Sequence, residues 1–168
     1  MQQLLISLLQ SHKIMRSIIV MILSVACLLT SCEPRPVAHD YCSTPIEGWE
    51  PGDTLKFSID TLRESGTYIL TLGLRASAST PCPYRSVWLA VRQHWHNPEQ
   101  QRIDTIELKL TDSKGDVIGH GVSLYQYTLP LDSLQLKAGS SAKFSINHVM
   151  RSEMLPGIAA VGVKLVRM

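Results

Sequence analysis

The sequence lacks a net charge once residues 1–31 are set aside. The whole chain of 168 residues has 16 lysines and arginines against 14 aspartates and glutamates. Lys13 and Arg16 lie in the leader, so 14 basic and 14 acidic residues remain. No charge block or basic stripe is left to attract a nucleic-acid backbone. We therefore do not expect nucleic acid as a partner.

The sequence also lacks the residue patterns of common catalytic sites. Ser123, in the glycine-containing stretch 119–123, is followed two residues later by Tyr125 and not by the glycine of a nucleophile elbow. No carboxylate pair stands out for general acid–base catalysis. The acidic residues of the early chain have the pattern of solvated charges at strand edges: Glu47, Glu50, Asp53 and Asp60. We expect no enzyme activity and no catalytic residues.

Metal-binding patterns are equally sparse. His94 and His96 would face the same way on a strand, but a third ligand would have to come from elsewhere in the chain. In residues 112–116 a lysine stands at a ligand position of a calcium loop, so this segment is expected to be a turn. The sequence predicts no metal site and no cofactor.

No apolar run is long enough to span a bilayer comfortably. The longest, residues 18–29, has about a dozen residues, whereas a membrane-spanning helix needs about 20. It follows a positively charged flank and ends in the small residues that precede Cys32. This order predicts a secretory signal peptide over residues 1–31. An uncleaved anchor helix is the alternative.

The end of that run, Leu29-Thr30-Ser31-Cys32, resembles the bacterial lipobox. Small residues beside the cysteine let the backbone lie extended in the narrow cleft of lipoprotein signal peptidase. The resemblance implies that Cys32 carries a diacylglyceryl lipid and is the first residue of the mature protein. Residues 1–14, upstream of Met15, are either a long first part of the signal or a mis-called start.

Two cysteines remain outside the leader and the lipobox, Cys42 and Cys82. In an oxidising compartment such a pair often forms a disulfide. A Cys42–Cys82 bond would add about 3–4 kcal/mol through loop-closure entropy. Two separate thiols are the alternative.

The mature chain divides into a predicted tether and one domain. Residues 32–46 contain three prolines and little that could be buried, so we expect a flexible, lipid-anchored tether. Residues 47–168 suffice for a single domain with its own core. In that domain Leu55, Phe57 and Ile59 alternate with polar residues, as in a half-buried strand.

Further alternating stretches and turns continue along the domain. A single helical turn is expected near residues 150–155. Seven to nine short strands at spacings of about ten residues predict an all-β fold, an antiparallel β-sandwich. The other expected strands lie at 67–74, 87–95, 106–110, 124–129, 134–137, 143–148 and 160–167.

Three tryptophans allow two uses. Trp49, Trp88 and Trp95 could form an exposed platform for sugars, or they could pack in the core or at its edge. Arg151, beside apolar residues, would suit a partner-binding hot spot. We take Arg151, Trp49 and Trp95 as candidate partner-binding residues.

The last third of the chain has an expected strand that ends in a His-x-Met-Arg segment at residues 144–151, a Leu-x-Gly-Ile turn at 155–158 and a closing strand at 161–165 that begins Val-Gly. This order resembles the closing pattern of the GldH gliding-motility lipoproteins of the Bacteroidota, in which the last strand reads Val-Gly-Leu. Residues 49–57, 83–89 and 108–121 resemble its earlier blocks. Together these segments cover most of residues 47–167, and the lipobox agrees. The Cys42/Cys82 pair lies outside the pattern.

This resemblance implies an outer-membrane lipoprotein that acts as an accessory or scaffold component with other gliding and type IX secretion-associated envelope lipoproteins. It implies no catalytic residue. Residues 33–35 lack the acidic run typical of surface-exposed Bacteroidota lipoproteins, so we expect the protein to face the periplasm. A glycan- or ligand-binding outer-membrane lipoprotein that uses the tryptophans is the alternative function.

Overall fold

The computed structural model describes Met15, Arg16, Met21 and residues 36–168. Apart from those three positions, the predicted signal peptide and start, together with the lipidation site Cys32, lie outside the described residues. In the described part of the chain, no helix has the length and apolar character needed to cross a membrane.

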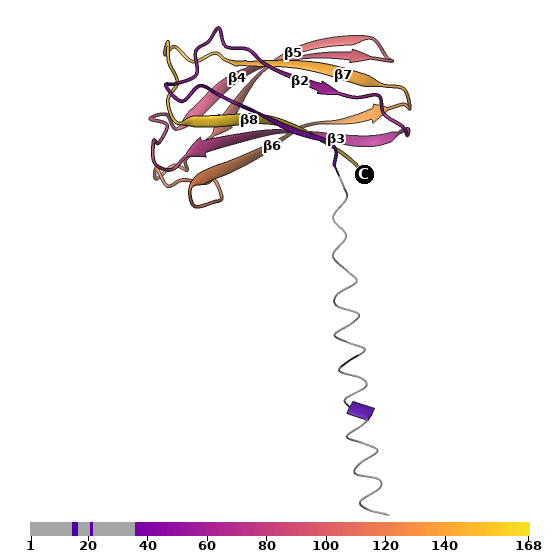
Figure 1. Ribbon diagram of the computed structural model, residues 1–168, viewed down its shortest axis with the longest axis horizontal. Coiled ribbons are helices and arrows are strands. Elements are labelled where there is room, and N and C mark those ends of the chain that lie inside the picture. The colour runs from indigo at the N-terminus through magenta and orange to yellow at the C-terminus, as the bar shows by residue number, and fades with distance from the viewer. Residues whose placement is uncertain (1–14, 17–20, 22–35) are drawn as a thin grey trace, which may run out of the picture. The chain divides into compact units, whose positions relative to one another are not determined.

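Residues 36–168 form two antiparallel four-stranded sheets packed face to face (Figure 1). One sheet has the order β1-β8-β3-β6 and the other β2-β7-β4-β5. The predicted all-β sandwich of seven to nine strands is therefore confirmed. The strands are β1 (Pro36–Ser43), β2 (Leu55–Ile59), β3 (Gly66–Ser77), β4 (Ser86–His96), β5 (Gln100–Lys109), β6 (Leu124–Leu136), β7 (Ser141–His148) and β8 (Ile158–Arg167).

Alternation along the strands builds the core between the sheets. In β4, Val87, Leu89 and Val91 are fully buried, while Trp88 and Arg92 point outward. Strands β2, β3 and β7 show the same alternation, because successive side chains of a strand face opposite sides of the sheet. Each buried aliphatic side chain contributes about 1.5–3 kcal/mol relative to exposure, so the inner rows hold the two sheets together.

The first strand corrects the predicted tether. Residues 36–43 are not free but pair with β8 along their length. Tyr41 of β1 lies over Gly73 and Gly162, which are directly opposite each other on β3 and β8. A Cβ added to Gly73 would meet the Tyr41 hydroxyl at 2.3 Å, and one added to Gly162 would meet its ring at 2.7 Å. The two glycines therefore form the seat that holds β1 on the sheet, where Arg75 also stacks 3.9 Å from the Tyr41 ring centroid.

Two other expectations differ from the structure. The separate strands predicted at 124–129 and 134–137 are one strand, β6, with a bulge at Leu131 beside Pro130. A proline is tolerated there because β6 is an edge strand and the bulge interrupts the hydrogen-bond ladder. The helical turn predicted near 150–155 is absent from this described segment, which makes bends and then pairs through Leu155 with Trp49.

Arg102 joins the two sheets along one open edge. Its Nε lies 2.7 Å from Asp104 Oδ2 on β5, and its Nη1 lies 2.6 Å from Asp132 Oδ2 on β6. These two carboxylates raise the pKa of Arg102, chiefly through the hydrogen bond from Asp132. Partly exposed ion pairs add little stability, so the role of Arg102 is to fix how β5 and β6 meet.

Candidate functional site

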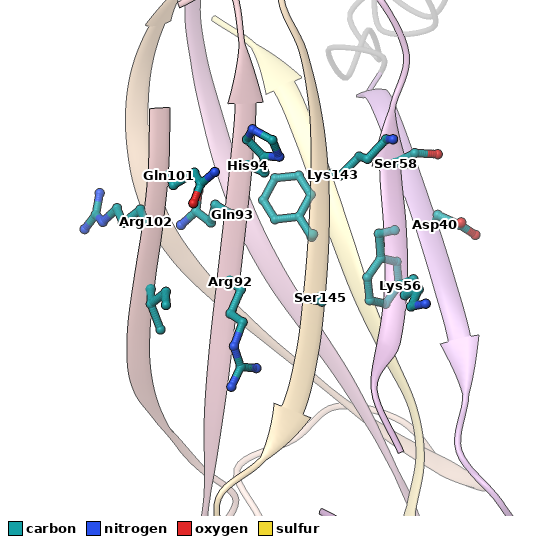
Figure 2. A pocket seen from close by; sticks show the side chains of 13 residues that line it. Asp40, Lys56, Ser58, Arg92, Gln93, His94, Gln101, Arg102, Lys143 and Ser145 are labelled. Carbon is teal, nitrogen blue, oxygen red and sulfur yellow. The ribbon is translucent and has the colours of Figure 1, made fainter. Parts of the chain in front are cut away.

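The outer surface of the β2-β7-β4-β5 sheet carries a hollow of about 530 Å³ (Figure 2). We call this surface the cationic face and define it by Lys56 of β2, Lys143 of β7 and Arg92 of β4. Figure 2 shows these side chains on neighbouring strands. Ser58, Ser145 and Gln101 also line the hollow.

Cross-strand register brings the three cations together. Lys143 lies opposite Ser58 and His94, while Ser145 lies between Lys56 and Arg92. Within the described residues, the ammonium groups of Lys56 and Lys143 have no hydrogen-bond or ion-pair partner, and Arg92 donates to Asn147 Oδ1 at 2.6 Å. The hollow is lined by four basic residues and one acidic residue, Asp40. Residues 32–168, which have a formal net charge of zero, thus present a local positive potential that attracts acidic groups.

A second hollow, of about 480 Å³, adjoins the exposed side chain of Trp88, and we call it the Trp88 hollow. Trp88 is 42% exposed, and Arg151 lies exposed beside it. The backbone holds the two walls together, since Val149 N–H donates to Trp88 O at 2.9 Å and Trp88 N–H to Met150 Sδ at 3.3 Å. Trp and Arg are the residues most enriched among interface hot spots. The structure therefore places the predicted Arg151 in a setting suited to a partner.

The partner-binding role predicted for Trp49 and Trp95 is wrong. Both are core residues, 0% and 4% exposed. Trp95 Nε1 donates to Gln93 Oε1 at 3.0 Å, and its ring packs edge-on against Phe144 at 5.7 Å. Strand parity was the signal that could have separated the tryptophans, because Trp95 shares the inward parity of Val87 and Trp88 does not.

Trp49 belongs to a buried network that closes one end of the sandwich. Its Nε1 donates to Asp53 O at 2.7 Å, and its backbone exchanges hydrogen bonds of 3.0 and 2.8 Å with Leu155. His148, also 0% exposed, packs edge-on against the indole and donates from Nε2 to Trp49 O at 2.8 Å. Met150 N–H donates to its Nδ1 at 3.3 Å. Burial lowers the pKa of His148, partly offset by its bond to Trp49 and by Asp53, so the imidazole is neutral and structural.

Of the two alternatives left open for Cys42 and Cys82, the structure has the separate thiols, and no disulfide joins these two residues. Cys42 lies on β1 and donates from Sγ to Lys56 O at 3.5 Å, across the edge between the sheets. Cys82 lies in the β3–β4 connection, where its backbone approaches Gly157. Burial is the main cause that raises the pKa of each thiol, so neither is activated as a nucleophile.

A cluster of three potential ligands lies at the tip of the β4–β5 hairpin. His94 Nε2 is 2.5 Å from Glu99 Oε1, and His96 Nδ1 is 2.9 Å from Glu99 Oε2. The hydrogen bonds from the two imidazoles lower the pKa of the Glu99 carboxyl. The sequence offered the two histidines but no third ligand. Glu99 supplies it because the turn at 97–98 folds the start of β5 back beside the end of β4.

Comparison with known proteins places the chain in a family. No curated protein matches it. Solved structures resemble it distantly. The carbohydrate-binding module CBM28, specific for non-crystalline cellulose, is 13% identical over 77% of this chain and 73% of that chain, with a TM-score of 0.40. A protein from Sulfurospirillum deleyianum is 12% identical over 78% of this chain and 98% of that chain (TM-score 0.39), and the Eiger TNF of S. frugiperda is 13% identical over 80% and 94% of the two chains (TM-score 0.34). Such low TM-scores support no functional argument. The profile of the GldH lipoproteins matches residues 36–165, most of the chain, and the protein belongs to the GldH lipoprotein family.

Proposed function

We propose that the protein is a non-enzymatic, lipid-anchored envelope component that serves gliding-motility or type IX secretion-type machinery as an accessory or scaffold. Its family membership supports an association with gliding motility. The anchor is a diacylglyceryl lipid on Cys32, and the domain faces the periplasm from the outer membrane. The observation that carries the scaffold role is the outer surface of one sheet, where Lys56 and Lys143 have no partner among the described residues. The exposed Trp88 lies on the same surface, and the exposed Arg151 lies beside it in the segment after β7.

The occupant of this surface is an acidic patch on another envelope protein of the same machinery. Lys56, Lys143 and Arg92 sit on three adjacent strands, so their spacing is fixed by the sheet and costs no backbone ordering on binding. The Trp88 hollow supplies the apolar anchor that cations alone lack. Charge on one part of a surface and an aromatic anchor on another is the usual division between steering and affinity at protein interfaces.

The exposed tryptophan platform on which the glycan-binding alternative depended is not formed by Trp49, Trp88 and Trp95. It required the three tryptophans to form a stacking surface, but Trp49 and Trp95 are buried and only Trp88 of the three is exposed. One exposed indole fits a protein hot spot as well as a sugar. The crosslinking experiment below separates the two, because glycan-uptake proteins would then be recovered.

We expect in-cell crosslinking of a tagged chain, followed by mild detergent extraction and mass spectrometry, to recover gliding- or secretion-associated lipoproteins. A Cys32→Ala variant loses the lipid, so its crosslinks to those proteins should fall to background. Fractionation of the same cells measures whether that variant leaves the membrane. Recovery of the chain alone, or with glycan-uptake proteins, would contradict the scaffold role.

Reversing charge on the cationic face should remove the same partners from an anchored chain. We expect the pair Lys56→Glu and Lys143→Glu to lower their crosslinked yield at least about tenfold, since like charges at an interface cost several kcal/mol. Both side chains are exposed, so the fold should persist. The matched control is Lys114→Glu with Lys137→Glu, which changes the net charge equally at exposed loop positions and should leave the yield unchanged. Equal yields from the two pairs would rule out this face.

A further inference from the structure

We propose that His94, His96 and Glu99 form a binding site for a divalent late first-row transition-metal ion, for which Zn²⁺ is the probe. The site lies at the tip of the β4–β5 hairpin, and His94 also lines the hollow of the cationic face. The metal-binding proposal does not require the docking role proposed above. Its ligand set is two imidazole nitrogens and one carboxylate. Imidazole is a ligand preferred by zinc, copper, nickel and iron, and protein zinc sites with three side-chain ligands combine it with carboxylates.

The geometry of the three groups fits one ion. The ligand atoms lie within 4.8 Å of one another, with His94 Nε2 and His96 Nδ1 at 2.5 and 2.9 Å from the two Glu99 oxygens. Around a tetrahedral ion with bonds of about 2.1 Å, ligand atoms stand about 3.4 Å apart. Small side-chain rotations reach that spacing. The ion then replaces the ring protons that the two imidazoles now direct at the carboxylate.

The backbone supplies this arrangement without a long-range rearrangement. His94 and His96 are two apart on β4, so both project from the same side of the strand, and their ring centroids are 4.5 Å apart. The turn that follows His96 is fixed by a hydrogen bond, because the fully buried Ser140 donates from Oγ to Asn97 O. Glu99 follows immediately and meets both rings. A preformed ligand set lowers the ordering cost of binding.

The charge, the ligand atoms and the solvent exposure around the three side chains determine which ions the site would bind. Lys143 lies opposite His94 on β7, and its positive charge opposes any cation, while the Glu99 carboxylate offsets it. Mg²⁺ and Ca²⁺ prefer sites made of oxygen ligands and do not compete. The histidine side chains are 38% and 45% exposed and that of Glu99 is 65% exposed, so solvent reaches the ion. Three protein ligands leave at least one position open to water or to a ligand from another molecule.

Isothermal titration of the full-length chain in non-ionic detergent with ZnCl₂, under reducing conditions, tests the site. We expect one saturable Zn²⁺ site that excess Mg²⁺ does not displace. His94→Ala and Glu99→Gln should each weaken it at least about tenfold, the scale of losing one metal contact. Circular dichroism should show both variants folded, since the changed side chains are exposed.

Two controls complete the measurement. His120→Ala removes another exposed histidine, on the segment before β6, and should leave the affinity unchanged. The double variant Cys42→Ser, Cys82→Ser removes the described thiols and should also retain the site. Absence of saturable Zn²⁺ binding in the wild type, or equal affinity in wild type, His94→Ala and Glu99→Gln, would overturn the proposal. So would a loss with His120→Ala as large as with His94→Ala.

Discussion

Replacing Trp49 by alanine should lower the free energy of unfolding by about 3–5 kcal/mol, the usual cost of truncating a fully buried tryptophan. The indole is 0% exposed and fills the end of the sandwich beside His148. Its loss leaves a cavity, removes the edge-on ring contact, and strips Asp53 O of its donor. Since a domain of this size is commonly stable by about 5–15 kcal/mol, the variant approaches the unfolding threshold.

Urea unfolding of residues 33–168, followed by circular dichroism, measures this cost. The matched control is Trp88→Ala, which removes the same side chain from a position 42% exposed and should cost under about 1 kcal/mol. In the crosslinking experiment the order reverses, and Trp88→Ala is the variant that loses partners while remaining folded. A stable Trp49→Ala protein with reduced partner recovery would restore Trp49 as a contact residue and contradict its place in the core.

The contrast between these tryptophans shows what alternation predicts and where it stops. Period-two patterning predicted most of the strands, though not β1, and it separates Val87 from Trp88, which lie on opposite faces of β4 in the structure. It could not place Trp49, which precedes β2 outside any alternating run. That residue is buried by Leu155, more than a hundred positions later. Pairings between distant segments carry no local signature.

The predictions for the tether and for the surroundings of His94 and His96 missed contacts for related reasons. Residues 36–43 contain a proline and few large apolar side chains, so nothing local distinguishes them from a linker. Their pairing depends on Gly73 and Gly162 leaving room for Tyr41. Glu99 likewise joins the histidines only because a hairpin turn reverses the chain. In both cases the contact depends on how the folded chain brings residues together, which the local alternation of apolar and polar residues does not show.

The family-like closing segment is mainly structural. His148 and Leu155 are fully buried and pack with Trp49, and Gly157 shapes the turn that leads into β8. Arg151 differs, because it is exposed beside Trp88. A resemblance carried by this segment therefore reflects shared packing, whereas the contacts that we propose for a partner lie on the outer face of the sheet that contains β4. Family membership alone therefore does not name the residues proposed to bind a partner.

Replacing Gly157 by alanine, a change of one methyl group, should lower the free energy of unfolding by about 2–5 kcal/mol. Gly157 has φ +81, a conformation that costs a residue with a Cβ about 1–2 kcal/mol. The added Cβ would also lie 2.5 Å from Cys82 N and from Thr80 O. Both are backbone atoms, which cannot rotate away as a side chain can, so the β3–β4 connection must shift. Overpacking of this kind adds about 1–3 kcal/mol.

Gly115→Ala separates the two causes. Gly115 also has positive φ, +95, but nothing lies within 4 Å of the position its Cβ would take. It should therefore cost only the conformational part, about 1–2 kcal/mol, in the same urea experiment. The difference in unfolding free energy between the two variants measures the cost of the close approach between Gly157 and the segment around Cys82. A hydrogen bond of 2.8 Å from Ser77 N–H to Gly157 O also joins the turn to the end of β3. Equal costs would mean that this close approach is not maintained in solution, and the β3–β4 connection would then be looser than its packing indicates.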